Sequence, residues 1–311
     1  MTTTSNVLDV PTTGVSSARK SWGVAPWLFL APAILVYGGF FLWPAFELVR
    51  LRLVQWDGLG SRTFVGLDNY ERLLSDRLFW RAFQHNVAFL VAGMTIPVAV
   101  GLALAVALAR SRLYGRVLFR TIFFLPQVLS SVTVAIIWGW IYNPSFGALN
   151  VALERVGLGM LQQRWLGNPD LVLASLFVAW SWVHYGFCMV IFIAAIDGID
   201  ETFFDAARVD GAGGWWQFRH VIVPFIRAPL TTVVLLTAIA AMQVFDLVFV
   251  LTNGGPARAS IVVPLYMIDN AFFFTRVGYA AAIAVALAAV ILVFSVLFLL
   301  MRGVFREEEE A

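Results

Sequence analysis

The sequence predicts an all-α membrane protein with six transmembrane helices and a cytoplasmic helix-turn-helix loop between the fourth and fifth helices. Three observations lead to this fold class. First, the 311 residues are 60% hydrophobic and 13% charged, with a mean hydropathy of +0.83, whereas ordinary soluble domains are about half apolar and a quarter charged. Second, windows of about 20 nearly charge-free residues recur, each long enough to cross the hydrocarbon core as a helix. Third, a polar segment with helix-capping residues, 200–229, interrupts them.

The expected transmembrane helices follow from these windows in chain order. They cover residues 27–49, 86–109, 118–141, 171–196, 230–251 and 279–301. The ends of the chain differ in composition from this part. Residues 1–22 are rich in Thr and Ser and predict a flexible cytoplasmic tail, and residues 304–311 predict an acidic cytoplasmic tail. We therefore expect one six-span domain over residues 23–303, with its polar loop at 197–229.

Positive charges predict the orientation, because short cytoplasmic loops hold an excess of Arg and Lys. The loop between the second and third spans contains four arginines, Arg110, Arg112, Arg116 and Arg120. Basic residues also flank the outermost spans on the same side, namely Arg19, Lys20, Arg302 and Arg306. Both termini and the 200–229 segment are then cytoplasmic. Six arginines between residues 50 and 81 oppose this pattern, but four acidic residues in that long segment dilute them.

The 200–229 segment has the local signals of two short helices joined by a turn. Asp200 is a favourable N-cap for the first helix, and Gly211 suits the left-handed position that follows a helix end. A second helix is expected from Trp215 until Pro224 stops it. The small Ala206–Ala207 pair would let the surface of another protein approach closely. The pattern predicts a segment that a partner protein contacts.

The order of residues in this segment resembles the EAA loop of ABC-transporter permeases. That pattern is Glu-Ala-Ala, three residues, Gly, nine residues, then Ile-x-Leu-Pro. Here the sequence reads Asp205-Ala206-Ala207, then Gly211, then Val221-Ile222-Val223-Pro224, with the spacing kept. Asp205 replaces the Glu, and two valines replace Ile and Leu. The alternative interpretation is an amphipathic cytoplasmic loop with no special role.

The resemblance implies that the loop forms a coupling helix, which sits in a groove of a separate ATP-binding subunit. Such a helix-in-groove contact needs apolar anchors, and Phe203, Phe204, Ala206, Ala207 and Val209 are expected to supply them. Salt bridges from Asp205 and Arg208 to the partner could surround these anchors. The full set of expected coupling residues is Phe203, Phe204, Asp205, Ala206, Ala207, Arg208, Asp210, Gly211 and Pro224.

Further segments resemble the carbohydrate-uptake group of these permeases, of the maltose-permease and glycerol-3-phosphate-permease type. They are Phe64 to Tyr70 (F-x-G-L-x-N-Y), Trp138 to Pro144 with Gly147, Asp246 to Pro256 and Gly278 to Ala281. The resemblance implies a bacterial inner-membrane location and several partners. These are a second, homologous and non-identical permease subunit, two ATP-binding cassette subunits and an extracytoplasmic solute-binding protein. Lipid surrounds the spans, and a net charge of +2 is too small to indicate nucleic acid.

No catalytic or cofactor chemistry is expected in this chain. A phosphate-binding Walker loop needs Gly-Lys-Ser/Thr after a spaced Gly, but the only lysine is Lys20, outside such a motif. The single cysteine, Cys188, is no metal site, and no Ser/His/Asp arrangement is visible. We expect no enzyme activity, no metal and no cofactor, so ATP hydrolysis would belong to another polypeptide.

The substrate-path candidates are polar and aromatic residues near mid-depth of spans three, four and five, because sugars are bound by hydrogen-bonding groups beside flat aromatic faces. They are Gln127, Ser131, Trp180, His184, Tyr185, Gln243 and Asp246. Such side chains also hold membrane helices together, which is the alternative role. For Asp246 the alternatives are a substrate or gate role and a structural role near the turn at residues 252–256.

The sequence as a whole predicts the permease subunit of a bacterial ABC importer for a sugar or related polyol. One alternative is a secondary transporter working alone, which the scarcity of intramembrane carboxylates disfavours. A membrane-embedded enzyme would need a cluster of catalytic side chains. A third possibility keeps the ABC class with a glycerol-phosphate-type cargo, since the cargo is set largely by the solute-binding protein.

Overall fold

The computed structural model of the protein describes residues 25–109 and 114–302. The chain divides into two units, residues 1–47 and 48–311. Several residues used above to predict orientation lie outside the described part, namely Arg19, Lys20, Arg110, Arg112 and Arg306, as do the expected tails at 1–22 and 304–311.

The first unit is helical throughout its described part. Helix α1 (Ala25–Tyr37) continues through the π-turn η1 (Gly38–Leu42) into α2 (Trp43–Leu51). The stretch Trp27–Leu51 is long and apolar enough to cross a membrane. Its large apolar side chains, among them Phe29, Leu35 and Phe40, are exposed, as expected for a helix that faces lipid. The first predicted span is therefore confirmed as a helix.

Three more helices are long and apolar enough to cross a membrane: α4 (Arg77–Ala109), α8 (Val172–Asp197) and α15 (Val277–Arg302). Two bent pairs could supply the remaining crossings. These are α5 (Arg116–Val128) with α6 (Ser131–Ile141), bent by 101°, and the stretch Gly214–Phe225 with α12 (Arg227–Met242), bent by 75°. The described residues thus hold four helices that are long and apolar enough to be spans, or up to six candidate spans if each bent pair is one span.

The third expected span, 118–141, is two helices instead of one. Helix α5 ends at Val128, Leu129 is extended, and Ser130 begins a new helix by accepting a hydrogen bond from the Thr133 amide at 3.2 Å. A serine N-cap of this kind stabilises a fresh helix start. Apolar composition alone could not reveal the break, because the two halves together are long and apolar enough to pass for one span.

The fifth expected span, 230–251, is also interrupted. Helix α12 ends at Met242, and α13 (Asp246–Thr252) begins three residues later. The intervening Gln243, Val244 and Phe245 are not helical. Asp246 stands in the first turn of α13, where a carboxylate interacts favourably with the positive end of the helix dipole.

The second loop helix ends at Phe225, one residue after the expected stop at Pro224. This helix comprises α10 (Gly214–Gln217), the π-turn η3 (Phe218–Ile222) and α11 (Val223–Phe225). In the π-turn the Val223 amide donates to the Phe218 carbonyl. A proline lacks an N–H group and crowds the carbonyl four residues earlier, so the wider turn before Pro224 lets the helix continue past it. The chain bends at Ile226 instead.

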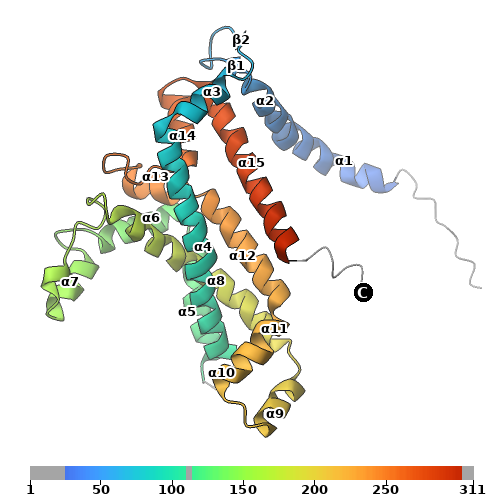
Figure 1. The fold of residues 1–311 in the computed structure, drawn as a ribbon, viewed down its shortest axis with the longest axis vertical. Coiled ribbons are helices and arrows are strands. Elements are labelled where there is room, and N and C mark those ends of the chain that lie inside the picture. The colour runs from blue at the N-terminus through green and yellow to red at the C-terminus, as the bar shows by residue number, and fades with distance from the viewer. Residues whose placement is uncertain (1–24, 110–113, 303–311) are drawn as a thin grey trace, which may run out of the picture. The chain divides into compact units, whose positions relative to one another are not determined.

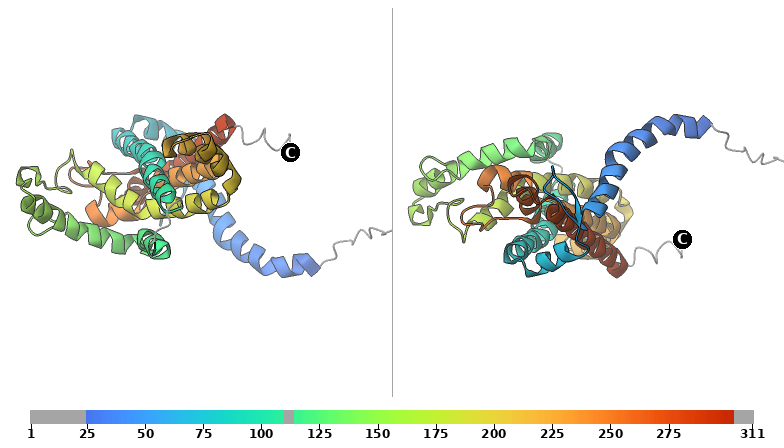
Figure 2. Two further views of the ribbon diagram at one scale, coloured as in Figure 1. Left: turned by 90° about the horizontal axis from the view of Figure 1, so that it is seen from below. Right: turned by 90° about the horizontal axis from the view of Figure 1, so that it is seen from above.

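In the second unit, α4, α8 and α12 lie side by side, with α5 along α8 (Figures 1 and 2). Glycines permit these close approaches. A Cβ atom on Gly101 of α4 would lie 2.5 Å from the Cβ atom of Cys188 of α8, and one on Gly186 of α8 would lie 2.5 Å from the Phe123 carbonyl oxygen of α5. Small residues at helix contacts are typical of membrane helix packing.

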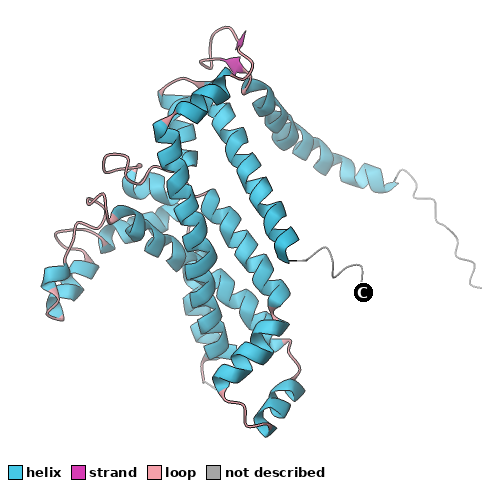
Figure 3. Ribbon diagram, viewed as in Figure 1, coloured by secondary structure: helices cyan, strands magenta, loops and turns pink. Residues whose placement is uncertain are grey.

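The short elements gather at the two ends of this unit (Figures 1 and 3). One end, here named the α3 end, holds α3 (Asp68–Ser75), α14 (Val263–Ile268) with the π-turn η4 (Asp269–Phe273), and the antiparallel pair β1 (Val54–Gln55) and β2 (Thr63–Phe64). The opposite end, the α9 end, holds α9 (Glu201–Val209), α10 and α11. Helix α7 (Ala148–Arg155) and the 3-10 turn η2 (Gly159–Leu161) connect α6 to α8.

Candidate functional site

A small cavity with a mixed polar and apolar lining lies where the two helix breaks meet. It encloses about 180 Å³, and α6 packs against α13 beside it. Five of the seven expected substrate-path residues line it, namely Ser131, Trp180, His184, Gln243 and Asp246. Ser131 opens α6, Gln243 follows α12 and Asp246 opens α13, so the breaks themselves place three of the five.

Trp180 and His184 form one wall of this cavity, which we name the central cavity. Their rings stack with centroids 3.8 Å apart and an angle of 17°, and His184 Nδ1 lies 2.8 Å from the Trp180 carbonyl oxygen, one helical turn away. Gly93 of α4 lies on another side of the indole, where an added Cβ atom would come within 3.1 Å of it. The indole is thereby held in one orientation and almost fully buried.

The polar edge of the cavity is open. Ser131, Gln243 and Asp246 are all exposed, and no Arg or Lys lines the cavity. Within the part of the chain that the structure describes, Asp246 has no side-chain hydrogen bond, and the Thr252 hydroxyl bonds to the Val248 carbonyl and to Ser260 instead. The structural role considered for Asp246 at the 252–256 turn is therefore absent from the described hydrogen bonds.

The remaining two candidates, Gln127 and Tyr185, do not line the cavity. Gln127 belongs to α5 and Tyr185 to α8, and these two helices pack along each other. The Tyr185 ring meets Phe123 edge-on at 6.4 Å, and the Gln127 Oε1 atom is buried without a hydrogen-bond partner among the described atoms. The contact of Tyr185 with Phe123 fits the alternative role, in which polar and aromatic side chains hold helices together.

Helix α9 begins and ends as the sequence predicts. The Asp200 side chain accepts a hydrogen bond from the Thr202 amide at 2.9 Å, and the hydrogen bonds from Thr202 hold the pKa of Asp200 below its usual value. Gly211 has φ +75°. Its amide donates to the Arg208 carbonyl, and the Ala212 amide donates to the Ala207 carbonyl at 2.8 Å. These two bonds define a Schellman motif.

Two of the expected docking anchors are buried in this chain. Phe204 is 1% exposed and Ala207 4% exposed, in a cluster that also contains Leu108 of α4 and Ile196 of α8. Their side chains hold α9 to the helices beside it and are not open to a partner. The apolar groups on the open face are Phe203, at 47% exposure, with Ala206 and Val209.

The charged residues of α9 are paired with one another. Arg208 contacts Asp205 at 2.7 Å and Glu201 at 2.5 Å. The i,i+3 spacing brings Asp205 and Arg208 together on one helix, and both side chains remain exposed, so their expected salt bridges to a partner stay a prediction. Asp210 ends the helix as its exposed C-cap, and Pro224 lies half-buried in α11.

The sequence did not predict that the Asp76 carboxylate accepts several hydrogen bonds at the α3 end. The Asp76 carboxylate accepts bonds from the hydroxyls of Tyr266, at 2.5 Å, and Tyr279, at 2.7 Å, and from the amides of Leu78 and Phe79. Partial burial acts to raise the pKa of Asp76, but these hydrogen bonds outweigh it and hold the pKa below its usual value. Only the Asp-x-x start of α4, an N-cap signal, was visible in the sequence.

A second centre at this end is Asn86, which is fully buried in α4. Its side chain donates to the Met242 carbonyl at 2.8 Å and accepts from the Val263 amide at 2.7 Å. One amide group thus links the end of α12 to the start of α14. These partners are 156 and 177 residues away in sequence, so no local pattern could reveal them.

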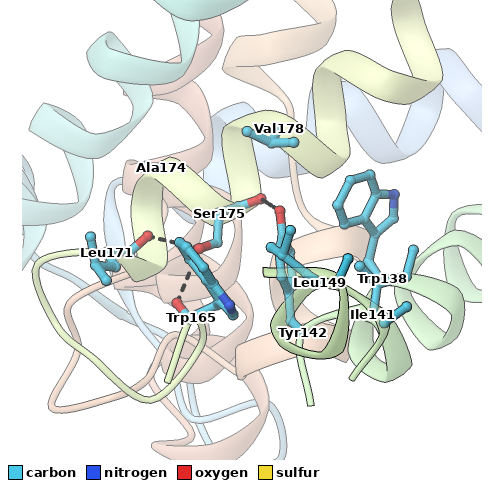
Figure 4. Close-up of a pocket in the computed structure, with 11 residues that line it drawn as sticks. Trp138, Ile141, Tyr142, Leu149, Trp165, Leu171, Ala174, Ser175 and Val178 are labelled. Carbon is cyan, nitrogen blue, oxygen red and sulfur yellow. Dashed lines mark hydrogen bonds between the residues drawn. The ribbon is translucent and has the colours of Figure 1, made fainter. Parts of the chain in front are cut away.

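A larger apolar cavity of about 500 Å³ lies between α6, α7 and α8 (Figure 4). Trp138, Leu149 and Trp165 are among its lining residues. The Tyr142 hydroxyl points to the Ser175 carbonyl and donates to it at 3.0 Å. This cavity has almost no polar lining and differs in chemistry from the central one.

Among the described residues, no three His, Cys, Asp or Glu side chains gather where they could hold a metal ion.

Comparison with known proteins identifies relatives over most of the chain. A family model described as "Binding-protein-dependent transport system inner membrane component" matches residues 96–306. "Probable ABC transporter permease protein YurN" of Bacillus subtilis is 37% identical over 277 residues, covering 88% of this chain and 94% of the relative. "Lactose transport system permease protein LacF" of Rhizobium radiobacter is 31% identical, covering 92% and 96% respectively.

A solved structure has the same fold. It is titled "Crystal structure of bacterial alginate ABC transporter in complex with alginate pentasaccharide-bound periplasmic protein". The matching chain superposes with a TM-score of 0.79, covering 89% of this chain and 93% of the other, at 22% sequence identity. At this identity the likeness establishes the fold alone.

Proposed function

Because the chain belongs to the family of binding-protein-dependent transport system inner membrane components, we propose that it is a permease subunit driven by ATP hydrolysis in a partner subunit docked on α9. We further propose that its cargo is a sugar or a related polyol. The fold, the mounting of α9 and the central cavity each supply one part of this proposal.

The observation that carries the proposal is that α9 packs one face against the long helices and leaves the other face open. Phe204 and Ala207 place one face of the helix in the same buried cluster as the ends of α4 and α8, while Phe203 and Val209 remain open. A push on the open face would therefore pass through packed side chains into the long helices. Closure of a partner around ATP would tilt these helices between two packings, as in other rigid-body switches.

The central cavity supports a polyol as cargo. Ser131, Gln243 and Asp246 offer hydrogen-bonding groups beside the fixed aromatic pair of Trp180 and His184. The lining residues include one carboxyl side chain, Asp246, and no Arg or Lys, and a carboxylate repels anions. This charge disfavours the alternative of a glycerol-phosphate-type cargo. The lactose permease among the relatives is consistent with an uncharged sugar.

Partners are needed because the cavity is open on its polar side and is too small to form a path alone. A second, homologous permease would close it, so that the cargo crosses between the two chains. Two ATP-binding subunits would dock on the two α9 helices. A solute-binding protein would deliver cargo at the α3 end, and the related alginate transporter is described in complex with such a periplasmic protein.

The proposal also fixes an orientation in the bacterial cytoplasmic membrane. The α9 end faces the cytoplasm, where ATP is available, and the α3 end faces outward. Arg116, Arg120 and Arg302 then lie on the cytoplasmic side, in agreement with the positive-inside rule. Both termini are cytoplasmic if each bent helix pair is one crossing.

Gly211→Val tests the coupling role. No heavy atom lies within 4 Å of a Cβ atom at this position, so space is not the obstacle, but φ is +75°, where a β-branched residue is strained by about 1–2 kcal/mol. We expect the Schellman turn to open, ATP-dependent uptake to be lost and the ATP-binding subunit to co-purify less, with normal membrane insertion. Uptake at the level of the unmodified protein would refute the role of α9.

Gly213→Val is the matched control for this test. Gly213 has φ −69° and equally open surroundings, so valine is accommodated without strain. Uptake and co-purification should stay close to normal. If both variants fail equally, bulk on this loop rather than the turn geometry would be responsible, and the assignment of the turn would be wrong.

A further inference from the structure

One face of the α10–α11 stretch carries two indole rings and two basic residues. Trp215, Trp216, Arg219 and His220 stand at positions i, i+1, i+4 and i+5, which share one side of a helix. All four are exposed, Trp215 by 74% and Trp216 by 46%. We name these four residues the aromatic–basic face. The opposite side of the stretch, with Val221 and Ile222, is buried against the bundle.

The side chains of this face are ordered by contacts with their own helix. The Trp216 ring stacks on His220 with centroids 4.5 Å apart, and the Trp215 ring stacks on Phe218 at 5.3 Å. Both indoles nevertheless remain open on their outer sides. Two large exposed tryptophans side by side are uncommon on a surface that meets only water, since Trp is mostly buried on average.

The direction of the stretch relative to the neighbouring span is informative. Gly214–Phe225 is bent by 75° from α12. If the chain crosses the membrane from α12 onward, with α12 along the membrane normal, the stretch that precedes α12 runs close to the plane of the membrane surface. Tryptophan is enriched at this depth, because its ring is apolar and its N–H is polar. Helices that lie in this plane carry basic residues on one side.

The charge of the stretch separates it from α9. No Asp or Glu occurs between Asp210 and Asp246, whereas Arg219 and Arg227 do, and neither guanidinium has an ion pair among the described residues. On α9, in contrast, Arg208 forms ion pairs with Glu201 and Asp205. An anionic membrane surface attracts the basic stretch and repels the acidic helix beside it.

We propose that the aromatic–basic face binds the anionic phospholipid headgroups of the adjacent leaflet and anchors the start of α12 at the membrane surface. The indoles lie at headgroup depth, Arg219 and Arg227 contact lipid phosphates, and α9 stays in water, where a partner can reach it. This anchoring requires that α12 crosses the membrane. It does not require that α9 docks an ATP-binding subunit.

Spin labels on the full-length chain test the proposal directly. Cys188 is fully buried, so a nitroxide attached to an introduced cysteine reports one site. His220→Cys places the label on the aromatic–basic face, and Val209→Cys places it on the open side of α9. In nanodiscs of phosphatidylcholine and phosphatidylglycerol, the label at 220 should collide more often with oxygen than with a water-soluble nickel chelate. The label at 209 should show the reverse.

Two matched variants test the charge. Arg219→Gln should lower the preference for phosphatidylglycerol over phosphatidylcholine by about fivefold, measured by the lipid that remains bound after purification. Arg208→Gln removes a guanidinium that is already paired and should change this preference little. Equal loss in both variants, or none in either, would overturn the proposal.

The same labels distinguish a lipid surface from a protein surface. In one outcome, the label at 220 collides with the nickel chelate in nanodiscs as often as the label at 209, and these collisions decrease only when the ATP-binding subunit is added. The face then binds protein, and the proposal is wrong. Protection of position 220 by lipid alone supports it. Failure of position 209 to respond to the ATP-binding subunit would refute the proposed coupling role and leave the lipid contact standing.

Discussion

The two ends of the second unit are held together in different ways. At the α3 end, polar side chains such as Asp76 and Asn86 join segments that are more than 150 residues apart. At the α9 end, the described polar contacts of α9 are local to the helix and its turn, and apolar side chains connect it to the rest. The α3 end is thus joined by directional hydrogen bonds between distant segments, whereas the described contacts that join α9 to the long helices are apolar.

This difference predicts that the two ends respond differently when the helices move. Hydrogen bonds are lost sharply when their geometry changes, so the α3 end should keep one arrangement. Apolar contacts are non-directional and tolerate some sliding. A helix attached in this way can tilt with its neighbours without breaking its attachment. The following substitutions test the comparison in order of decreasing expected effect.

Phe204→Ala should have the largest effect, because it removes the main apolar attachment of α9. Loss of a fully buried Phe side chain costs about 3–5 kcal/mol. We expect α9 to detach, so that limited proteolysis cuts the 197–229 loop faster and the melting temperature falls. Phe203→Ala is the control, since Phe203 is half-exposed and should change the melting temperature little. Equal effects would mean that α9 is not held by its buried face.

Asn86→Ala should come next and act at the other end. It leaves the Met242 carbonyl and the Val263 amide without their partner, which costs about 1–3 kcal/mol for a buried group. Thermal unfolding should show this loss, and hydrogen exchange should increase at Val263. An unchanged exchange rate would show that Asn86 is not the link between α12 and α14.

Asp76→Asn should change how stability depends on pH. The pKa of Asp76 is held below its usual value, so the folded state binds this proton less tightly than the unfolded state. The resulting stabilisation is complete above the unfolded pKa, about 3.9, and is lost as the pH falls through the lower folded pKa. The variant should be less stable at pH 7 and should lose less on acidification to pH 3. Asp68→Asn, at an exposed position of α3, should follow the unmodified protein.

Arg208→Gln should have the smallest effect on stability. The arginine and its partners are each half-exposed or more, and exposed ion pairs contribute about 0–1 kcal/mol. The melting temperature should stay within about a degree or two of normal, as expected for such a small change. A large drop would show that polar contacts hold the α9 end after all.

Much of the fold was predictable because apolar windows of this length have few alternatives. The windows at 171–196 and 279–301 match α8 and α15 to within two residues at each end. The breaks at Leu129 and after Met242 were not predicted, since hydropathy averages over a window and hides one polar cap. Ser130 in an apolar run, and Gln243 with Asp246 in another, were the available signals.

The candidate sites were predictable where they depend on local geometry. The N-cap at Asp200 and the left-handed turn at Gly211 follow from residue type and spacing. Which face of α9 is buried could not be read from the sequence, because Phe203 and Phe204 are equally apolar neighbours. The role of Asp76 depends on Tyr266 and Tyr279, whose positions are set by the tertiary fold.

The break between α12 and α13 also limits what mutagenesis can reveal about the central cavity. The first amide groups of a helix have no partner within it, so α13 presents backbone N–H groups beside Asp246. No side-chain substitution removes them. Exchange of the side chains around this break would therefore leave its backbone donors in place.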